Sequence, residues 1–241
     1  MEIVVCKDYN DMSLRAAEMA AGIMKGKARF VLGLATGSTP VGMYRRWAEL
    51  NQAGQLDFSN VTTFNLDEYI GLPPEHDQSF AYFMFDNLFN HVNIDKNRVH
   101  IPCGMAEDYD AYCRKYEEMI REAGGIDLQI LGIGSNGHIG FNEPADTFSE
   151  NTHTVDLTES TIRDNSRFFA SADLVPRRAV TMGIGTILRT RRIIKVVSGA
   201  NKAAALKAMK EGPETPAMPA SALIRHPDVT VFADADAAAL L

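Results

Sequence analysis

The chain has 241 residues, 46% of them hydrophobic and 23% charged, which excludes a disordered, collagen-like or coiled-coil protein. Its 24 basic and 31 acidic residues give a net charge of −7, so nucleic acid and anionic membranes are not expected partners. No apolar run reaches the ~18 residues that a membrane-spanning helix needs.

The N-terminus lacks the pattern of a secretion signal, and three cysteines (Cys6, Cys103 and Cys113) are too few and too scattered for a disulfide framework or a zinc site. Reduced thiols of this kind are typical of the cytoplasm. The length favours one domain over residues 1–241.

Short apolar runs alternate with amphipathic stretches along the chain. A strand at residues 3–5 is followed by a helical pattern in which Leu14, Ala17, Ala21 and Met24 share one face. A later helical pattern places Tyr112, Tyr116 and Ile120 together. The remaining strands are expected at residues 30–34, 61–66, 99–101, 126–133, 179–182, 193–197 and 229–232.

This alternation predicts an α/β fold: a single open, mostly parallel twisted sheet of Rossmann-like type with helices on both faces. The strands are β-branched or apolar throughout rather than alternating with polar residues, as in sheets that are covered on both sides. In such sheets ligands bind beyond the carboxyl ends of the strands. Four segments follow predicted strands in this way, namely residues 35–40, 67–73, 134–144 and 198–202, and we expect the chemistry there.

The first of these segments has the features of an anion-binding turn. Gly37 permits a tight turn, Ser38 and Thr39 add hydroxyl donors, and Pro40 suits the first helical position. The free N–H groups at a helix start attract anions. The alternative interpretation is an ordinary helix cap made by Thr39.

A second strand-to-helix turn, residues 198–202, places Lys202 in the first helical turn, where a cation opposes the helix dipole. That placement makes sense if Lys202 holds an anion, although it also fits a solvated lysine. Arg167 offers the forked donors that suit phosphate. Together these features indicate a phosphorylated small-molecule ligand.

Residues 132–137 match the dinucleotide pattern G-x-G-x-x-G, but glycine, asparagine and proline follow in quick succession. The segment therefore predicts an irregular loop rather than a nucleotide-binding helix start. The same loop contains Asn136, His138 and Glu143. A histidine transfers protons near neutral pH, and a carboxylate can orient it.

Asp67 and Glu68 follow the strand at residues 61–66. A carboxylate sheltered there can have a raised pKa and act as a base. In extended chain the two side chains point to opposite sides, so only one faces the cleft. The alternative is a carboxylate that caps the helix starting near Ser79. The other histidines lack metal-ligand spacing, and neither a metal nor a cofactor is expected.

The segments LGLATGSTP (32–40), FNLDEY (64–69) and GSNGHIGFNEP (134–144) resemble the glucosamine-6-phosphate deaminase family, as do NSRFF (165–169) and SGANK (198–202). The resemblance runs from about residue 2 to the C-terminus. The related 6-phosphogluconolactonases share the fold and the glycine-rich turns but lack the G-H-I-x-F-N-E-P string.

The resemblance implies conversion of glucosamine 6-phosphate and water to fructose 6-phosphate and ammonia in amino-sugar catabolism, without a metal. His138 would open the sugar ring with support from Glu143, and Asp67 would then move a proton from C2 to C1. The phosphate-binding residues carried over are Thr36, Gly37, Ser38, Thr39, Arg167 and Lys202. A mobile lid would correspond to residues 150–175.

Some family members have aspartate at the position of Asn136, so the resemblance leaves open whether Asn136 or Glu143 is the main partner of His138. Allosteric members use basic side chains to bind N-acetylglucosamine 6-phosphate between subunits, where this chain has His153 and Val155. We therefore expect no response to that compound. The sequence does not distinguish a monomer from a homo-oligomer.

Overall fold

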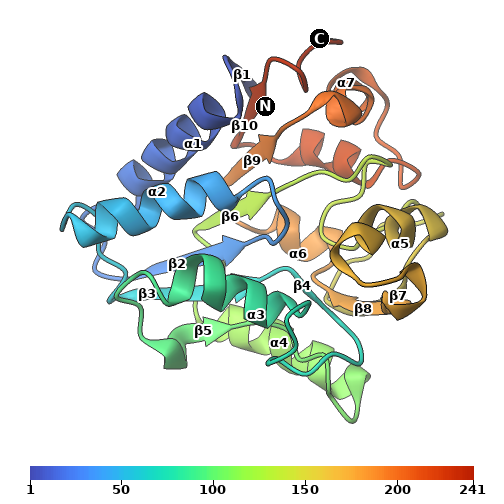
Figure 1. The fold of residues 1–241 in the computed structure, drawn as a ribbon, viewed down its shortest axis with the longest axis horizontal. Coiled ribbons are helices and arrows are strands. Elements are labelled where there is room, and N and C mark those ends of the chain that lie inside the picture. The colour runs from blue at the N-terminus through green and yellow to red at the C-terminus, as the bar shows by residue number, and fades with distance from the viewer.

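The computed structural model describes all 241 residues. Its main element is a seven-stranded parallel sheet with the order β1-β10-β9-β6-β2-β3-β5 (Figure 1). The predicted Rossmann-like α/β architecture is confirmed, and every strand of this sheet overlaps a predicted run. The strands are β1 (Glu2–Cys6), β2 (Phe30–Leu34), β3 (Val61–Asn65), β5 (Val99–His100), β6 (Leu128–Leu131), β9 (Ile193–Val197) and β10 (Val229–Asp234).

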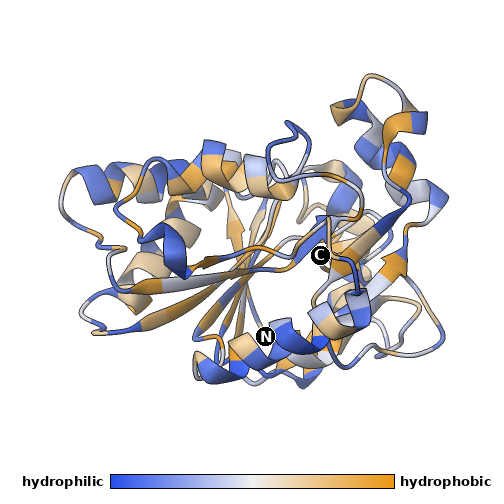
Figure 2. Cartoon of the chain, turned by 90° about the horizontal axis from the view of Figure 1, so that it is seen from below, coloured by the Kyte–Doolittle hydropathy of each residue, from blue (hydrophilic) through white to orange (hydrophobic).

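Helices cover both faces of the sheet, which Figure 2 shows from its side. On one face lie α1 (Tyr9–Met24), α2 (Val41–Gln52), α3 (Phe80–Met84) and the π-helical turn Phe85–Phe89. On the other lie α4 (Tyr109–Glu122), α6 (Ile184–Leu188), α7 (Ala203–Glu211) and the 3-10 helix Pro219–Arg225. Each face therefore has its own hydrophobic core. No helix is both long and apolar enough to cross a membrane.

The predicted helix faces are confirmed in part. Tyr116 and Ile120 are buried under the sheet. In α1, Ala17 and Met24 are buried as well, but Leu14 is 41% exposed. The prediction for Leu14 is wrong because the buried face of α1 contains Met12, Ala16 and Ala20. Leu14 lies roughly 200° from Met12 around the helix and therefore points away from that face.

A second, antiparallel sheet has the order β4-β8-β7. Its strands are β4 (Asp67–Tyr69), β8 (Arg178–Thr181) and β7 (His153–Asp156). The expectation that residues 179–182 join the parallel sheet is therefore wrong. Leu66 connects the two sheets: its N–H donates to Leu34 O, and its carbonyl accepts from Met182 N. This bridge holds β4 just beyond the carboxyl end of β3.

The segment between β7 and β8 lies at the right of Figure 1, beside the main body. It contains α5 (Glu159–Asn165) and the 3-10 helices Ser166–Phe168 and Ala172–Leu174. A small core formed by Tyr69, Phe141, Leu157, Ile162 and Val175 joins it to β4 and to the loop after β6.

Candidate active site

The four segments singled out in the sequence follow four strands that are neighbours in the order β9-β6-β2-β3. Because these strands are parallel, their carboxyl ends lie at one edge of the sheet, and the chain changes its winding direction between β6 and β2. The predicted convergence of the segments at one sheet edge is confirmed.

Asp67 is the first residue of β4 and is only 6% exposed. Burial, and secondly the charge of Glu68, raise the pKa of Asp67 to about 8, and no hydrogen bond to its carboxylate counteracts this. A Cβ atom added to Gly140 would lie 3.3 Å from Asp67 Oδ2. The loop after β6 therefore approaches this carboxylate closely, and Asp67 has the properties of a base that works near neutral pH.

Glu68 has a different role from its neighbour. Its carboxylate accepts hydrogen bonds from the N–H groups of Tyr69 (2.8 Å), Phe80 (2.9 Å) and Ala81 (2.9 Å). Glu68 thus caps the start of α3, so the alternative of a helix-capping carboxylate is correct for this residue. Burial raises the pKa of Glu68 to about 7, although the three N–H donors lower it. Asp67 is left as the carboxylate available for proton transfer.

The segment at residues 132–137 is a loop without a helix start, as predicted. Gly134 N donates to His138 O at 2.9 Å, and a Cβ atom at Gly134 would come within 2.3 Å of the His138 ring. Glycine at this position therefore makes room for the imidazole. Asn142 Nδ2 donates to Met182 O at 2.8 Å and ties the loop to the end of β8.

Asn136, His138 and Glu143 lie together, as predicted. Glu143 Oε2 is 3.6 Å from His138 Nδ1 and accepts a 2.8 Å hydrogen bond from Asn136 Nδ2. Burial alone would raise the pKa of Glu143, but contacts from His138, Thr161 and Asn136 outweigh it and lower that pKa to about 2. Glu143, rather than Asn136, faces the imidazole, and Asn136 instead orients Glu143.

The turn at residues 36–39 leaves backbone donors available. Gly37 has φ +96°, and α2 begins at Val41, one residue later than predicted from Pro40. Thr39 makes no capping hydrogen bond to this helix, so the alternative of an ordinary Thr39 cap does not hold; the Tyr9 hydroxyl instead accepts from Gly42 N at 2.8 Å. The N–H groups of Ser38 and Thr39 donate to no protein atom. The turn forms no hydrogen bond to the other predicted site residues, but it lies at the same sheet edge.

The second turn is built around Gly199, with φ +95°. Asp234 fixes the turn by accepting from Ser198 Oγ (2.5 Å) and Gly199 N (3.1 Å). Lys202 ends the 3-10 helix Ala200–Lys202 and immediately precedes α7. Burial lowers the pKa of Lys202, although the negative charge of Asp164 opposes this and the positive charge of Arg167 adds to it. Neither Lys202 nor Arg167 forms an ion pair with a carboxylate within 4 Å, and no direct contact joins the two predicted cations.

Thr181 is a site residue that sequence reasoning missed. It is the antiparallel partner of Asp67 in β4, and its Oγ1 accepts a 3.0 Å hydrogen bond from Phe141 N in the loop after β6. Thr181 thereby connects the base to the loop of His138. Its place in an apolar run gave no signal, because the pairing joins residues that are distant in the sequence.

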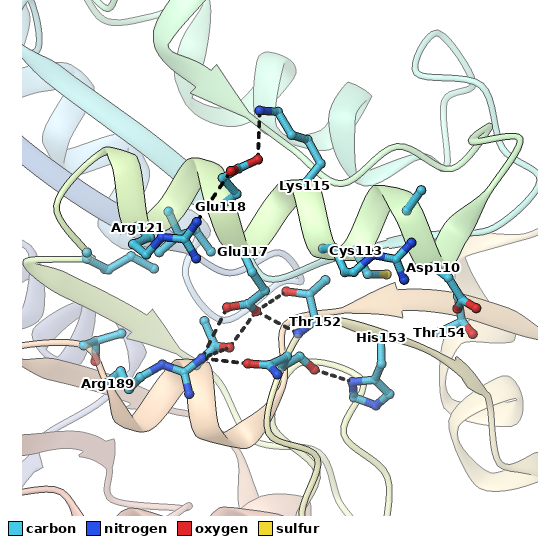
Figure 3. A pocket seen from close by; sticks show the side chains of 18 of the residues that line it. Asp110, Cys113, Lys115, Glu117, Glu118, Arg121, Thr152, His153, Thr154 and Arg189 are labelled. Atoms are coloured by element: carbon cyan, nitrogen blue, oxygen red, sulfur yellow. Dashed lines mark hydrogen bonds and ion pairs between the residues drawn. The ribbon is translucent and has the colours of Figure 1, made fainter.

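A cavity of about 1330 Å³ lies away from these residues, between α4, β7 and α6 (Figure 3). Glu117 crosses it, accepting from Thr152 N (2.7 Å), Thr186 Oγ1 (2.6 Å) and Arg189 Nη2 (3.2 Å). Most basic side chains that line the cavity form ion pairs, because Arg189 contacts Glu117 and both Lys115 and Arg121 contact Glu118. The cavity wall is a network of internal ion pairs rather than a cluster of free positive charge.

Comparison with known proteins connects this geometry to a family. The model of the family described as glucosamine-6-phosphate isomerases/6-phosphogluconolactonase matches residues 9–232. The glucosamine-6-phosphate deaminase of Thermoanaerobacter pseudethanolicus is 56% identical over the whole chain and 95% of its own length. That of Halothermothrix orenii is also 56% identical, with both chains fully covered.

Among solved structures, a monomeric glucosamine-6-phosphate deaminase superposes with a TM-score of 0.98 at 46% identity, with both chains fully covered. A 6-phosphogluconolactonase from Thermotoga maritima gives a TM-score of 0.76 at 22% identity, covering 97% of this chain and 98% of its own. The second similarity concerns the fold alone.

Proposed function

Because the chain belongs to the family of glucosamine-6-phosphate isomerases and 6-phosphogluconolactonases, we propose that it is a glucosamine-6-phosphate deaminase. It converts glucosamine 6-phosphate and water to fructose 6-phosphate and ammonia. The observation that carries this assignment is a buried carboxylate with a raised pKa, Asp67, next to the loop that holds the His138–Glu143 pair. Proton abstraction beside a carbonyl needs one such base, and ring opening needs a separate acid–base group.

The phosphate group binds at the two turns in this proposal. The N–H groups of Gly37, Ser38 and Thr39, together with the Thr36 and Thr39 hydroxyls, provide neutral donors at the start of α2. Lys202 and Arg167 supply the positive charge. Because the phosphate is remote from the reacting carbons, its binding energy positions C1 and C2 against the catalytic groups.

Ring opening is assigned to His138. Its imidazole takes the proton of the anomeric hydroxyl and returns a proton to the ring oxygen, which breaks the C1–O5 bond and produces the free aldehyde. Glu143 stabilises the positive imidazolium that forms between these two transfers, and the hydrogen bond from Asn136 keeps the carboxylate in place.

Asp67 then takes the proton from C2 while the aldehyde oxygen at C1 gains a proton, which gives an enolamine. Asp67 delivers its proton to C1, and the enolamine becomes an imine at C2. Water adds to that carbon, and the C2–N bond breaks to release ammonia and leave the ketone. Burial supports this role because it raises the pKa of Asp67 to about 8. A group that both accepts and returns a proton works best when its pKa is close to the pH of the reaction.

We assign two further properties on the same basis. Residues 150–175, which carry α5 and Arg167, form the lid that covers the bound sugar phosphate. The enzyme works in the cytoplasm, in keeping with three free cysteine thiols.

The direct test is an assay of ammonia and fructose 6-phosphate released from glucosamine 6-phosphate by the purified protein. Both products should form in equal amounts, and unphosphorylated glucosamine should be a very poor substrate. The same preparation is offered 6-phosphogluconolactone, and hydrolysis of that ester without ammonia release from the amino sugar would reassign the protein as a lactonase.

A further inference from the structure

Lys195, the third residue of β9, is a lysine inside the protein, with an exposed fraction of 0%. Lysine is almost never fully buried unless a group of opposite charge accompanies it. Here burial lowers the pKa of Lys195 to about 7, and no neighbouring charge counteracts this. The catalytic steps described above do not use this side chain, so its place in the core needs another explanation.

The amine of Lys195 forms one hydrogen bond, in which Nζ donates to Gly132 O at 2.7 Å. Lys195 is the register partner of Leu131, and the pairing of β6 with β9 ends at these two residues. Gly132 is therefore the first residue beyond the sheet, and no backbone N–H donates to its carbonyl. The lysine side chain reaches past the end of the strand pairing and supplies the donor that the backbone does not.

Gly132 begins the loop that holds His138. The far end of this loop is tied to the end of β8 by Asn142, whose Nδ2 donates to Met182 O. The hydrogen bond from Lys195 is the corresponding tie at its beginning, and it comes from the strand that leads into the turn at residues 198–202. Both ends of the loop are thus held by side-chain hydrogen bonds to neighbouring strands.

We propose that Lys195 is a positioning residue, whose hydrogen bond to Gly132 O fixes the start of the loop after β6 and so keeps His138 in place for ring opening. The inference rests on the proposed function for the role of His138. The strand partners of Lys195 are Leu131 and Val231, so an apolar side chain would suit this place better than an unpaired amine. Residues that serve activity at the expense of stability are expected close to active sites.

The test compares Lys195→Met with Gln129→Met. Methionine is a flexible apolar side chain that can fill the space of the lysine, but it donates no hydrogen bond. Gln129 in β6 is fully buried too, and its Nε2 donates to Ile130 O of the same strand. The control therefore replaces a buried polar side chain near the loop and leaves every bond to the loop intact.

The readouts are kcat, KM, the inhibition constant of inorganic phosphate, the urea midpoint and the hydrogen–deuterium exchange of the amides of residues 132–141. We expect Lys195→Met to lower kcat about 10–100-fold, the scale expected when a catalytic group is slightly misplaced. KM and the phosphate inhibition constant should change less than about threefold, because the phosphate turns keep their contacts. The loop amides should exchange faster, and the urea midpoint should be equal or higher, because an unpaired amine has left the core.

In Gln129→Met, kcat and the exchange of the loop amides should stay close to those of the unmodified protein. Normal kcat or unchanged loop exchange in Lys195→Met would overturn the proposal. A loss of kcat that Gln129→Met shares, or that comes with a lower urea midpoint, would also overturn it, since either result indicates a general effect on the fold. If the unmodified protein releases no ammonia from glucosamine 6-phosphate, the proposed function fails, and the loop exchange, which needs no substrate, decides separately whether Lys195 holds the loop.

Discussion

Replacement of Asp67 by asparagine should remove activity and increase stability at alkaline pH. The amide has almost the same shape as the carboxylate but cannot accept a proton from C2. Loss of a general base costs about 10²–10⁴-fold in turnover, which corresponds to roughly 3–5 kcal/mol in the activation barrier.

The stability effect follows from the pKa of Asp67, which burial and the charge of Glu68 raise from 3.8 to about 8. Below about pH 4 the carboxyl is protonated in the folded and the unfolded chain, and it causes no difference between the two proteins. Between pH 4 and pH 8 the unfolded chain releases the proton and the folded one keeps it, so the free energy of unfolding of the unmodified protein falls as the pH rises.

Asp67→Asn has no such loss, and above pH 8 we expect its free energy of unfolding to exceed that of the unmodified protein by ~1–3 kcal/mol. The gain is smaller than the pKa difference alone would give, because the buried amide also lacks a partner. Urea unfolding at pH 4 and pH 9 measures both limits, and ammonia release measures the activity.

Glu68→Gln is the matched control, because it changes the adjacent buried carboxylate in the same way. It should retain most of the turnover, and the acidic limb of its kcat/KM profile should move to lower pH because one charge that raises the pKa of Asp67 is gone. Near-normal turnover in Asp67→Asn together with a large loss in Glu68→Gln would show that the base has been misassigned. Lower stability of Asp67→Asn at pH 9 would refute the account of its pKa.

Three further expectations concern other parts of the site. Glu143→Gln should lose ~1–2 kcal/mol in the free energy of unfolding at pH 7 and none near pH 2. The lowered pKa of Glu143 means that the carboxylate stabilises the folded protein above about pH 4.5 and that this stabilisation is lost toward pH 2. Equal urea midpoints of the variant and the unmodified protein at pH 7 would contradict this. Lys202→Ala should raise KM for glucosamine 6-phosphate by about 10–100-fold through loss of a charge-assisted contact, whereas an unchanged KM would remove Lys202 from the phosphate site. Initial rates should follow a hyperbola in the substrate concentration, with or without N-acetylglucosamine 6-phosphate. In β7, Val155 has no charge and burial lowers the pKa of His153, so neither provides a positive charge for the phosphate of that compound. A sigmoidal curve that the compound makes hyperbolic would contradict this expectation.

The sequence predicted the parallel sheet well because its strands are short, mostly apolar runs, and β2, β6, β9 and β10 are buried along their whole length. That signal depends on local composition. The sheet edge followed from the same pattern, since parallel strands place their carboxyl ends together. His138 and Glu143 were found because they share one loop, and the backbone only had to fold locally to bring them into contact.

The second sheet could not be predicted in the same way. Strand β4 has three residues and β7 only four, and the exposed Asp156 in β7 gives no apolar run. Both form because β8 pairs with them, and antiparallel pairing between distant segments has no local signature. The separate roles of Asp67 and Glu68 were not predictable either. Only the position of α3 in the folded chain shows that its N–H groups bind Glu68 and not Asp67.

Thr181 explains why the site needs the second sheet. Its backbone pairs with Asp67 on one side and with His153 on the other, while its hydroxyl accepts the N–H of Phe141. The same hydroxyl lies 2.8 Å from the position that a Cβ atom on Gly140 would take. One residue of β8 therefore fixes both the strand of the base and the loop of the imidazole. A buried carboxylate without hydrogen bonds is unfavourable by itself, so it needs a rigid support that is supplied from outside the main sheet. The parallel sheet ends at Leu66, at the carboxyl edge of its strands, and the antiparallel sheet fixes the positions of Asp67 and of the loop with His138 at that edge.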